Sequence, residues 1–175
     1  MTEAPIEIVE YDSRWPALFA RERELMAEAL AQWLTGPPEH IGSTAVPGLA
    51  AKPIIDIMAP VGSLADSEAA IVAAECIGYV YFPYKAELMH WFCKPSPACR
   101  THHLHLVPAG GRLWRERLAF RDALRRDAAL RAEYQALKLR LAAEYRHDRE
   151  TYTDAKSPFI SRVVQAVLGD QGSAA

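Results

Sequence analysis

The segment from residue 39 to residue 57 constrains the fold more than any other part of the chain. It reads EHIGSTAVPGLAAKPIIDI: a short strand-like run enters Gly42-Ser43, a loop of small residues follows, and an acid stands inside the next apolar run. Asp56 lies between Ile55 and Ile57, so in a strand its side chain points to the face opposite theirs. A carboxylate there must be paired, exposed in a cleft or bound to a metal. The segment therefore predicts two strands joined by a loop beside a polar site.

The loop has the composition of a phosphate contact. Gly42 lets a ligand approach the backbone closely, and the hydroxyls of Ser43 and Thr44, with nearby amides, suit phosphate oxygens. Lys52 stands at the mouth of the following strand, where it either neutralises phosphate or lies in solvent. The alternative for Ser43 is a structural turn or a helix cap. We interpret these residues as candidate phosphate ligands.

The rest of the chain alternates between strand-like and helical patterns. Apolar periodicity predicts strands at 6–11, 39–41, 54–59, 79–82, 88–94 and 102–107, and helices from 12 or 13 to 34, at 66–77, from 112 to 145 and at 151–168. The Pro95-Ser96-Pro97 run is typical of a hairpin, and residues 169–175 are expected to form a frayed tail. This pattern predicts a single α+β domain over residues 1–175, in which a mixed sheet packs against helices and a helical C-terminal third follows.

Two histidines stand on the strand predicted at 102–107. His103 and His105 are two residues apart and therefore face the same way. If Asp56 shares that face, the set suits Zn²⁺, Mn²⁺, Fe²⁺ or Ni²⁺ better than Mg²⁺. The alternative is that both histidines are hydrogen-bonded strand residues lining a groove. We interpret His40, one strand away, as a core residue.

The chain resembles the GrpB proteins, a family placed in the nucleotidyltransferase superfamily. The resemblance rests on the 39–57 segment and on the runs YDSRW, THHLHL, FRDALR, YQALK and KSPFI at 11–15, 101–106, 120–125, 134–138 and 156–160. It implies a nucleotidyltransferase-like core that takes a nucleotide or a phosphorylated small molecule. Similar domains occur fused to dephospho-CoA kinases, whereas this chain has no P-loop and looks like a free-standing version.

The sequence departs from the superfamily at the metal ligands. The superfamily pattern places two acids on the strand, separated by one residue, and they hold Mg²⁺ or Mn²⁺ for nucleotidyl transfer. Asp56 matches the first acid, but Met58 stands at the second, and a thioether does not hold Mg²⁺. A third acid is also missing, because the neighbouring strand offers His103 and His105. We therefore expect Asp56 as the candidate catalytic residue and all three as ligands of a transition metal.

Basic residues are expected to make the cleft locally positive although the formal net charge is −2. Phosphate binding requires such charge, and Arg100, Arg121 and Lys156 are the candidates beside Lys52. The usual alternative for such residues near helices is a solvated face. We assign Arg121 and Lys156 to phosphate binding as a hypothesis.

Composition limits the function classes. Apolar residues make up 50% and charged residues 24%, an ordinary globular balance, and the net charge does not point to nucleic acid or an anionic membrane. The first ten residues lack a secretory signal, and the three cysteines follow no disulfide framework. A cytoplasmic protein is expected. Three hypotheses stay open: a metal-dependent transferase or phosphohydrolase, a non-catalytic nucleotide-binding module, and a chaperone-like partner of another protein.

Overall fold

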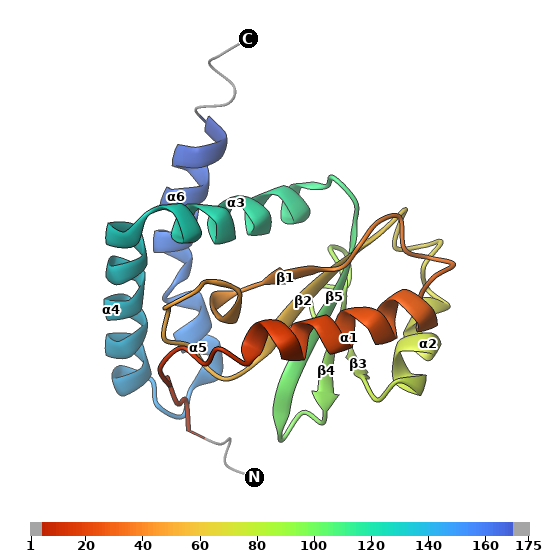
Figure 1. The fold of residues 1–175 in the computed structure, drawn as a ribbon, viewed down its shortest axis with the longest axis horizontal. Coiled ribbons are helices and arrows are strands. Elements are labelled where there is room, and N and C mark those ends of the chain that lie inside the picture. The colour runs from red at the N-terminus through yellow and green to blue at the C-terminus, as the bar shows by residue number, and fades with distance from the viewer. Residues whose placement is uncertain (1–4, 170–175) are drawn as a thin grey trace.

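The computed structural model describes residues 5–169, so the predicted tail beyond Gly169 lies outside the described residues. Within that range a sheet stands between helices (Figure 1). The helices are α1 (Trp15–Ala29), the short 3₁₀ helix η1 (Ser43–Ala45), α2 (Ala70–Cys76), α3 (Arg112–Arg126), α4 (Ala128–Glu144), α5 (Arg149–Asp154) and α6 (Ser157–Gly169). The strands are β1 (Glu39–Ile41), β2 (Ile55–Val61), β3 (Val80–Phe82), β4 (His90–Pro95) and β5 (Arg100–Pro108).

The five strands form one mixed sheet in the order β1-β2-β5-β4-β3. The central pair, β2 and β5, is parallel, and every other neighbouring pair is antiparallel. The predicted hairpin is present, because β4 turns directly into β5. In the central pair, Asp56 lies opposite His103. The α+β class predicted from the sequence is confirmed, and its parallel pair sets the two histidines beside the acid.

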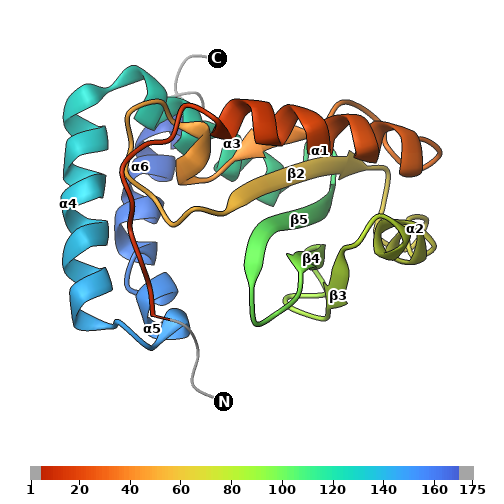
Figure 2. The same cartoon turned by 60° about the horizontal axis from the view of Figure 1, so that its bottom comes forward.

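One face of the sheet is covered by α1 and α2. The alternating residues Ile55, Ile57 and Ala59 of β2 point to this face and pack against Met26 and Leu30 of α1 in the largest core cluster. Burial of such side chains contributes roughly 1.5–3 kcal/mol each. The second view shows α1 lying along the sheet and α2 beyond its far edge (Figure 2). This face therefore carries the core and leaves the opposite face for the site.

The opposite face is only partly apolar. Met58 and Trp91 pack there with Leu113 and Leu118 of α3. Beyond one end of the sheet stands the helical third, with α4, α5 and α6 side by side and the segment before α1 running along them (Figure 2). Backbone hydrogen bonding ties this segment to the helices, since the Ile6 amide donates to the Arg146 carbonyl at 2.8 Å.

Several predicted element bounds are wrong. Residues 6–11 do not form a strand, because only Val9 bridges to another segment, at Ala51. Strand β2 runs to Val61 instead of ending at 59, because its pairing with β5 continues to Pro108 and Leu34 bridges Val61 on the other side. Both α1 and α2 are shorter than predicted, and the helix expected from 112 to 145 is interrupted.

The interruptions in the helical third have local causes. Asp127 ends α3 and caps α4, because its side chain accepts hydrogen bonds from the backbone amides of Ala129 and Leu130. The helix predicted at 151–168 is two helices, α5 and α6, separated at residues 155–156. Asp148 caps α5 by accepting from the Thr151 amide. Within residues 5–169, none of these helices combines the length and the hydropathy that crossing a membrane requires.

Candidate metal and phosphate site

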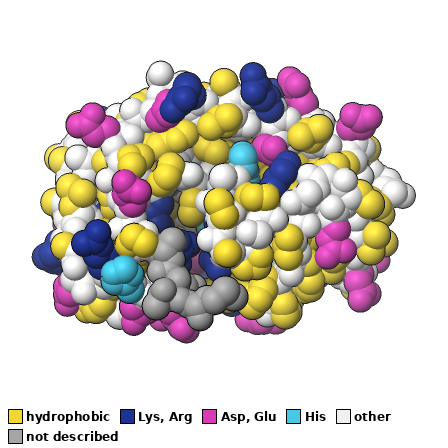
Figure 3. Space-filling view, turned by 90° about the horizontal axis from the view of Figure 1, so that it is seen from below, with side chains coloured by type: hydrophobic (Ala, Val, Ile, Leu, Met, Phe, Trp, Pro, Cys, Tyr) yellow, Lys and Arg dark blue, Asp and Glu magenta, His cyan; other side chains and the backbone are white. Residues whose placement is uncertain are grey.

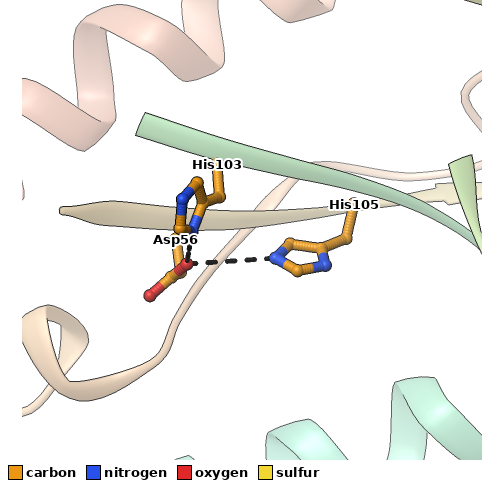
Figure 4. A group of neighbouring side chains, drawn as sticks. All are labelled: Asp56, His103 and His105. Carbon is orange, nitrogen blue, oxygen red and sulfur yellow. Dashed lines mark hydrogen bonds and ion pairs between the residues drawn. The ribbon is translucent and has the colours of Figure 1, made fainter. Parts of the chain in front are cut away.

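Three side chains meet on the face of the sheet that α1 leaves open (Figure 4). Asp56 comes from β2, and His103 and His105 come from β5 beside it. The His103 Nδ1 atom lies 2.9 Å from Asp56 Oδ1, and the His105 Nε2 atom lies 3.9 Å from the same oxygen. One ligand atom from each residue can be chosen so that all three lie within 4.8 Å of one another. The structure thus brings together the acid and the two histidines that the sequence singled out.

The protonation states follow from the surroundings of this triad. Burial alone would raise the pKa of Asp56, but the hydrogen bond with His103 and the electrostatic influence of both nearby imidazoles outweigh it and hold this pKa well below its usual range. Burial lowers the pKa of His105 to about 4, with the nearby Arg117 charge acting in the same direction. At neutral pH the site therefore holds an ionised carboxylate beside a neutral imidazole, which is the state in which both bind metals.

The second nitrogen of His105 faces sulfur. Its Nδ1 atom lies 3.3 Å from Met89 Sδ. If the neutral ring carries its proton on Nδ1, then Nε2 has a free lone pair, and this atom is the one that faces Asp56. Among residues 5–169, Nε2 of His105 is buried and has no hydrogen-bond partner. His103 Nδ1 and the Asp56 carboxylate share a hydrogen bond, and a metal ion bound by both residues would replace the proton of that bond.

Gly42 forms the wall behind Asp56. Its φ of +71° and ψ of −173° fall in a region that is essentially restricted to glycine. A Cβ atom at this position would lie 2.5 Å from Asp56 Oδ2. The predicted close approach at Gly42 is therefore made by the carboxylate of Asp56. Ser43 follows at once and contacts the hydroxyl of Tyr134, which is buried on α4.

Three lysines, hereafter the lysine cluster, gather near the acid: Lys52, Lys138 and Lys156. The ammonium groups of Lys52 and Lys156 lie 4.5 Å and 4.4 Å from the ring centre of Tyr152. Lys138 is 2% exposed and donates a hydrogen bond to the Ala50 carbonyl. Burial lowers the pKa of Lys138 to about 7, and repulsion from Lys156 and Lys52 adds to it.

Lys156 interacts electrostatically both with the other lysines of the cluster and with Asp56. Burial, followed by repulsion from Lys52, lowers the pKa of Lys156 to about 8, whereas the charge of Asp56 opposes this shift. Lys156 is therefore the member of the lysine cluster on which the charge of Asp56 acts. Seen from below, Lys and Arg atoms lie deep in a hollow of the surface (Figure 3). Of the lysine cluster, Lys52 and Lys156 were predicted from the sequence, and Lys138 was not.

Arg117 of α3 is a further residue that the sequence reasoning did not select. Burial lowers its pKa, and the negative charge of Asp56 is the main opposing influence. Its Nε atom is buried without a hydrogen-bond partner in the described part of the chain. The signal was present in the sequence, because Arg117 shares the helix stripe of Leu113, four residues earlier, which packs on the sheet.

Thr44 and Arg121, two of the predicted phosphate ligands, form hydrogen bonds to other groups of the fold. The buried Thr44 hydroxyl donates to the Ile54 carbonyl at 3.1 Å and lies 3.0 Å from His40 Nε2. The Arg121 guanidinium donates to Glu39 at 2.6 Å and to the His40 carbonyl at 3.0 Å. Both side chains therefore have partners inside the fold, and His40 is buried as interpreted.

The loop between β1 and β2 is held by side chains from the helical third. Arg125 Nε donates to the Ala45 carbonyl at 2.9 Å, and the Ala50 amide donates to Gln135 Oε1 at 2.9 Å. Lys138 bonds the Ala50 carbonyl as described above. These contacts satisfy backbone groups of an irregular segment that has no ladder of its own.

The GrpB protein family model matches residues 5–166. The chain belongs to the GrpB family. Its similarity extends to a UPF0157 protein of Deinococcus radiodurans, which is 42% identical over 87% of this chain and 77% of that protein. The glutamate-rich protein GrpB of Alkalihalophilus pseudofirmus is 30% identical over 94% of this chain and 97% of that protein. The crystal structure of the conserved protein GrpB from Enterococcus faecalis superposes with a TM-score of 0.84 at 31% identity, covering 94% of this chain and 99% of that one.

Proposed function

We propose that this GrpB protein binds a nucleotide or a phosphorylated small molecule together with one divalent transition metal. The observation that carries the proposal is the position of Asp56, which lies against two imidazoles and close enough to Lys156 of the lysine cluster for the two charges to interact. The imidazoles and the carboxylate would hold the metal. Lys52 and Lys156, with Ser43 at the loop, would hold phosphate oxygens.

The donor set decides which metal fits. The position of the superfamily's second acid is occupied by Met58, which is fully buried and packs with Ile41 and Trp91. A pair of Mg²⁺ ions therefore lacks its carboxylates here, because Mg²⁺ requires oxygen ligands. One carboxylate with two imidazoles suits Zn²⁺ or Mn²⁺. Bound there, such an ion would polarise a phosphoryl oxygen.

The balance of charge favours an anionic ligand. Asp56 is a single carboxylate, whereas Arg117 and the lysine cluster supply an excess of positive charge around it. Burial and then mutual repulsion lower the pKa values of Lys138 and Lys156, and the negative charge of a nearby phosphate group would offset both effects by favouring the charged ammonium. Phosphate oxygens accept strong charge-assisted hydrogen bonds from such donors.

Catalysis and simple retention remain two candidate outcomes of this binding. The single carboxylate and the buried Met58 favour a module that retains its ligand. The metal-dependent hydrolase or transferase is the second candidate, favoured by the mixed imidazole and carboxylate set. The two differ in whether the phosphate ester is consumed, which phosphate release and product chromatography measure directly.

Calorimetric titration of Zn²⁺ and of Mn²⁺ into the purified protein tests the metal site. We expect the wild type to bind one ion and the His103→Ala/His105→Ala double variant to bind none. His102→Ala is the matched control, because His102 lies on the same strand with its side chain on the opposite face of the sheet. Equal binding by the wild type and the double variant, or no binding by either, would overturn the metal assignment.

A thermal-shift series with ATP and inorganic tripolyphosphate tests the phosphate assignment separately. Free ligand at about 100 times its dissociation constant stabilises a binding protein by about 2.7 kcal/mol. We expect this stabilisation in the wild type and its loss in Lys52→Met/Lys156→Met. Absence of any shift in the wild type with either anion would exclude phosphate as the ligand class.

A further inference from the structure

The register of the sheet extends the row of site residues toward the edge strand β3. His105 pairs with Trp91 on β4, and Trp91 pairs with Phe82 on β3. Paired residues on neighbouring strands point to the same face. The indole of Trp91 and the phenyl ring of Phe82 therefore lie on the face that carries Asp56 and the histidines.

Three aromatic side chains assemble at this edge and are called the aromatic group: Phe82, Tyr84 and Trp91. The Phe82 and Tyr84 rings meet the Trp91 ring at centroid distances of 6.3 Å and 6.2 Å. Trp91 is 9% exposed, but Phe82 is 53% exposed and Tyr84 is 43% exposed. Four of the eight exposed large hydrophobic side chains among the described residues fall between positions 80 and 88. Exposed apolar surface gathered in this way is typical of a binding site.

The aromatic group is continuous with the proposed metal and phosphate site. The Trp91 ring lies 5.0 Å from the His103 ring, centroid to centroid. Tyr84 and Asp56 both lie close enough to Arg117 of α3 for their charges to act on its guanidinium. The Arg100 guanidinium lies 5.5 Å from the Trp91 ring centre. Cationic and aromatic groups thus follow one another from β2 to β3.

The span of this surface suits an elongated ligand. Three strand spacings separate β2 from β3 in the sheet order, which corresponds to about 14 Å. A phosphate or sugar phosphate at Lys156 and Asp56 leaves the aromatic group uncovered. A nucleoside polyphosphate carries its charge at one end and a planar, stacking base at the other, and so covers both.

We propose that the aromatic group binds the base of a nucleoside phosphate whose phosphates lie at the lysine cluster. This inference rests on the proposed function, because it takes the phosphate position from it. The exposed faces of Phe82 and Tyr84 would stack on the base, and Trp91 would position Phe82, Tyr84 and His103 from below. Stacking on aromatic rings accepts any base, since every base has a π face, so the proposal names a nucleoside phosphate and no particular base.

Isothermal titration with two probes tests the assignment: ATP and inorganic tripolyphosphate, each with Mn²⁺. Both carry three linked phosphates, and only ATP carries a base. We expect ATP to bind the wild type more tightly, and the Phe82→Ala/Tyr84→Ala variant to lose about 10-fold or more of its ATP affinity. Its affinity for tripolyphosphate should not change. Both substituted side chains are exposed, so the fold should tolerate their removal.

Two further variants make the result specific. Tyr84→Phe keeps the ring and should keep ATP affinity. Leu18→Ala/Val72→Ala removes comparable exposed apolar surface from α1 and α2, on the other side of the sheet, and should change neither probe.

The possible results separate the two proposals. Unchanged ATP affinity in Phe82→Ala/Tyr84→Ala, or equal loss for both probes, overturns the base assignment while leaving the phosphate site intact. Equal wild-type affinity for the two probes also overturns it. Failure of both probes to bind the wild type overturns the proposed function, and the base assignment with it.

Discussion

Replacing Gly42 by alanine places a methyl group against the carboxylate of Asp56. The new Cβ would lie 3.1 Å from Asp56 Cβ, a tight contact, and 2.5 Å from Asp56 Oδ2, which is closer than Cβ atoms approach in folded proteins. The substitution also forces a residue with a side chain into a backbone region that is essentially restricted to glycine. Both the loop and the carboxylate must therefore shift.

The cost follows from these two contributions. The backbone contribution is about 1–3 kcal/mol, and overpacking of a rigid contact adds about 1–3 kcal/mol. We expect Gly42→Ala to lower the free energy of unfolding by about 4 kcal/mol. For a chain of this length the melting temperature then falls by about 8–16 °C. Urea denaturation followed by circular dichroism measures the free energy, and calorimetry measures the temperature.

Gly48→Ala is the matched control. Gly48 also has a positive φ, of +77°, but no atom lies within 4 Å of a Cβ built there. It should therefore show the backbone cost alone, about 2 kcal/mol. Combining Gly42→Ala with Asp56→Ala should recover part of the loss, because the clashing oxygens are gone. If Gly42→Ala and Gly48→Ala cost the same and the double variant recovers nothing, the contact with Asp56 does not explain why position 42 is glycine.

Two further substitutions test the assignments of buried groups. Lys138→Met removes an ammonium whose pKa burial lowers to about 7, from about 10.5 in the unfolded chain. Wild-type stability from this group therefore rises with pH between about 7 and 10.5, and in urea titrations the substitution should be about 3 kcal/mol more favourable at pH 6 than at pH 9. An effect independent of pH would show that Lys138 is not buried as an ammonium. Thr44→Val leaves the Ile54 carbonyl without its donor and should cost about 1–3 kcal/mol while ATP affinity stays unchanged. A loss of ATP affinity at preserved stability would instead return Thr44 to the phosphate site.

The strand–loop–strand segment and the facing histidines could be predicted because both depend on a period of two. Asp56 between Ile55 and Ile57 must point away from the core that they enter, and His103 and His105 must share a face. What the period does not supply is the partner strand. The parallel pairing of β2 and β5 joins segments separated by β3 and β4. The family resemblance predicted that the two strands are neighbours, and their orientation was not predicted.

The N-terminal alternation misled for a physical reason. Ile6 is buried and packs with Leu141 and Tyr152, and Ile8 packs against the same cluster. Alternate burial against helices produces the same period as a strand, although residues 6–8 have no strand partner. An alternating pattern shows that one side of a segment is buried. It does not show whether the segment pairs with a neighbouring strand or packs against helices.

Of the lysine cluster, Lys52 and Lys156 were candidates in the sequence, whereas Lys138 was missed because its position depends on helix phase. Lys138 stands on the stripe of Tyr134 and Leu141, so a charge on a buried face was the available signal. Lys156 owes its position to the separation of α5 from α6, for which Pro158 in the first turn of α6 was the marker. The shape of the 42–53 loop had no local signal, because its partners lie far along the chain.

Those partners have a consequence for the order in which the molecule is built. Arg125, Gln135 and Lys138 bond loop residues that precede them by 80, 85 and 88 positions. Closing chain segments of this length is slow compared with forming a helix or a hairpin. During synthesis from the N-terminus, the loop is made early but must wait for α4 before its backbone groups find their partners. We expect amide exchange to slow in residues 45–50 only after α4 has formed, so the loop between β1 and β2 is completed among the last parts of the fold.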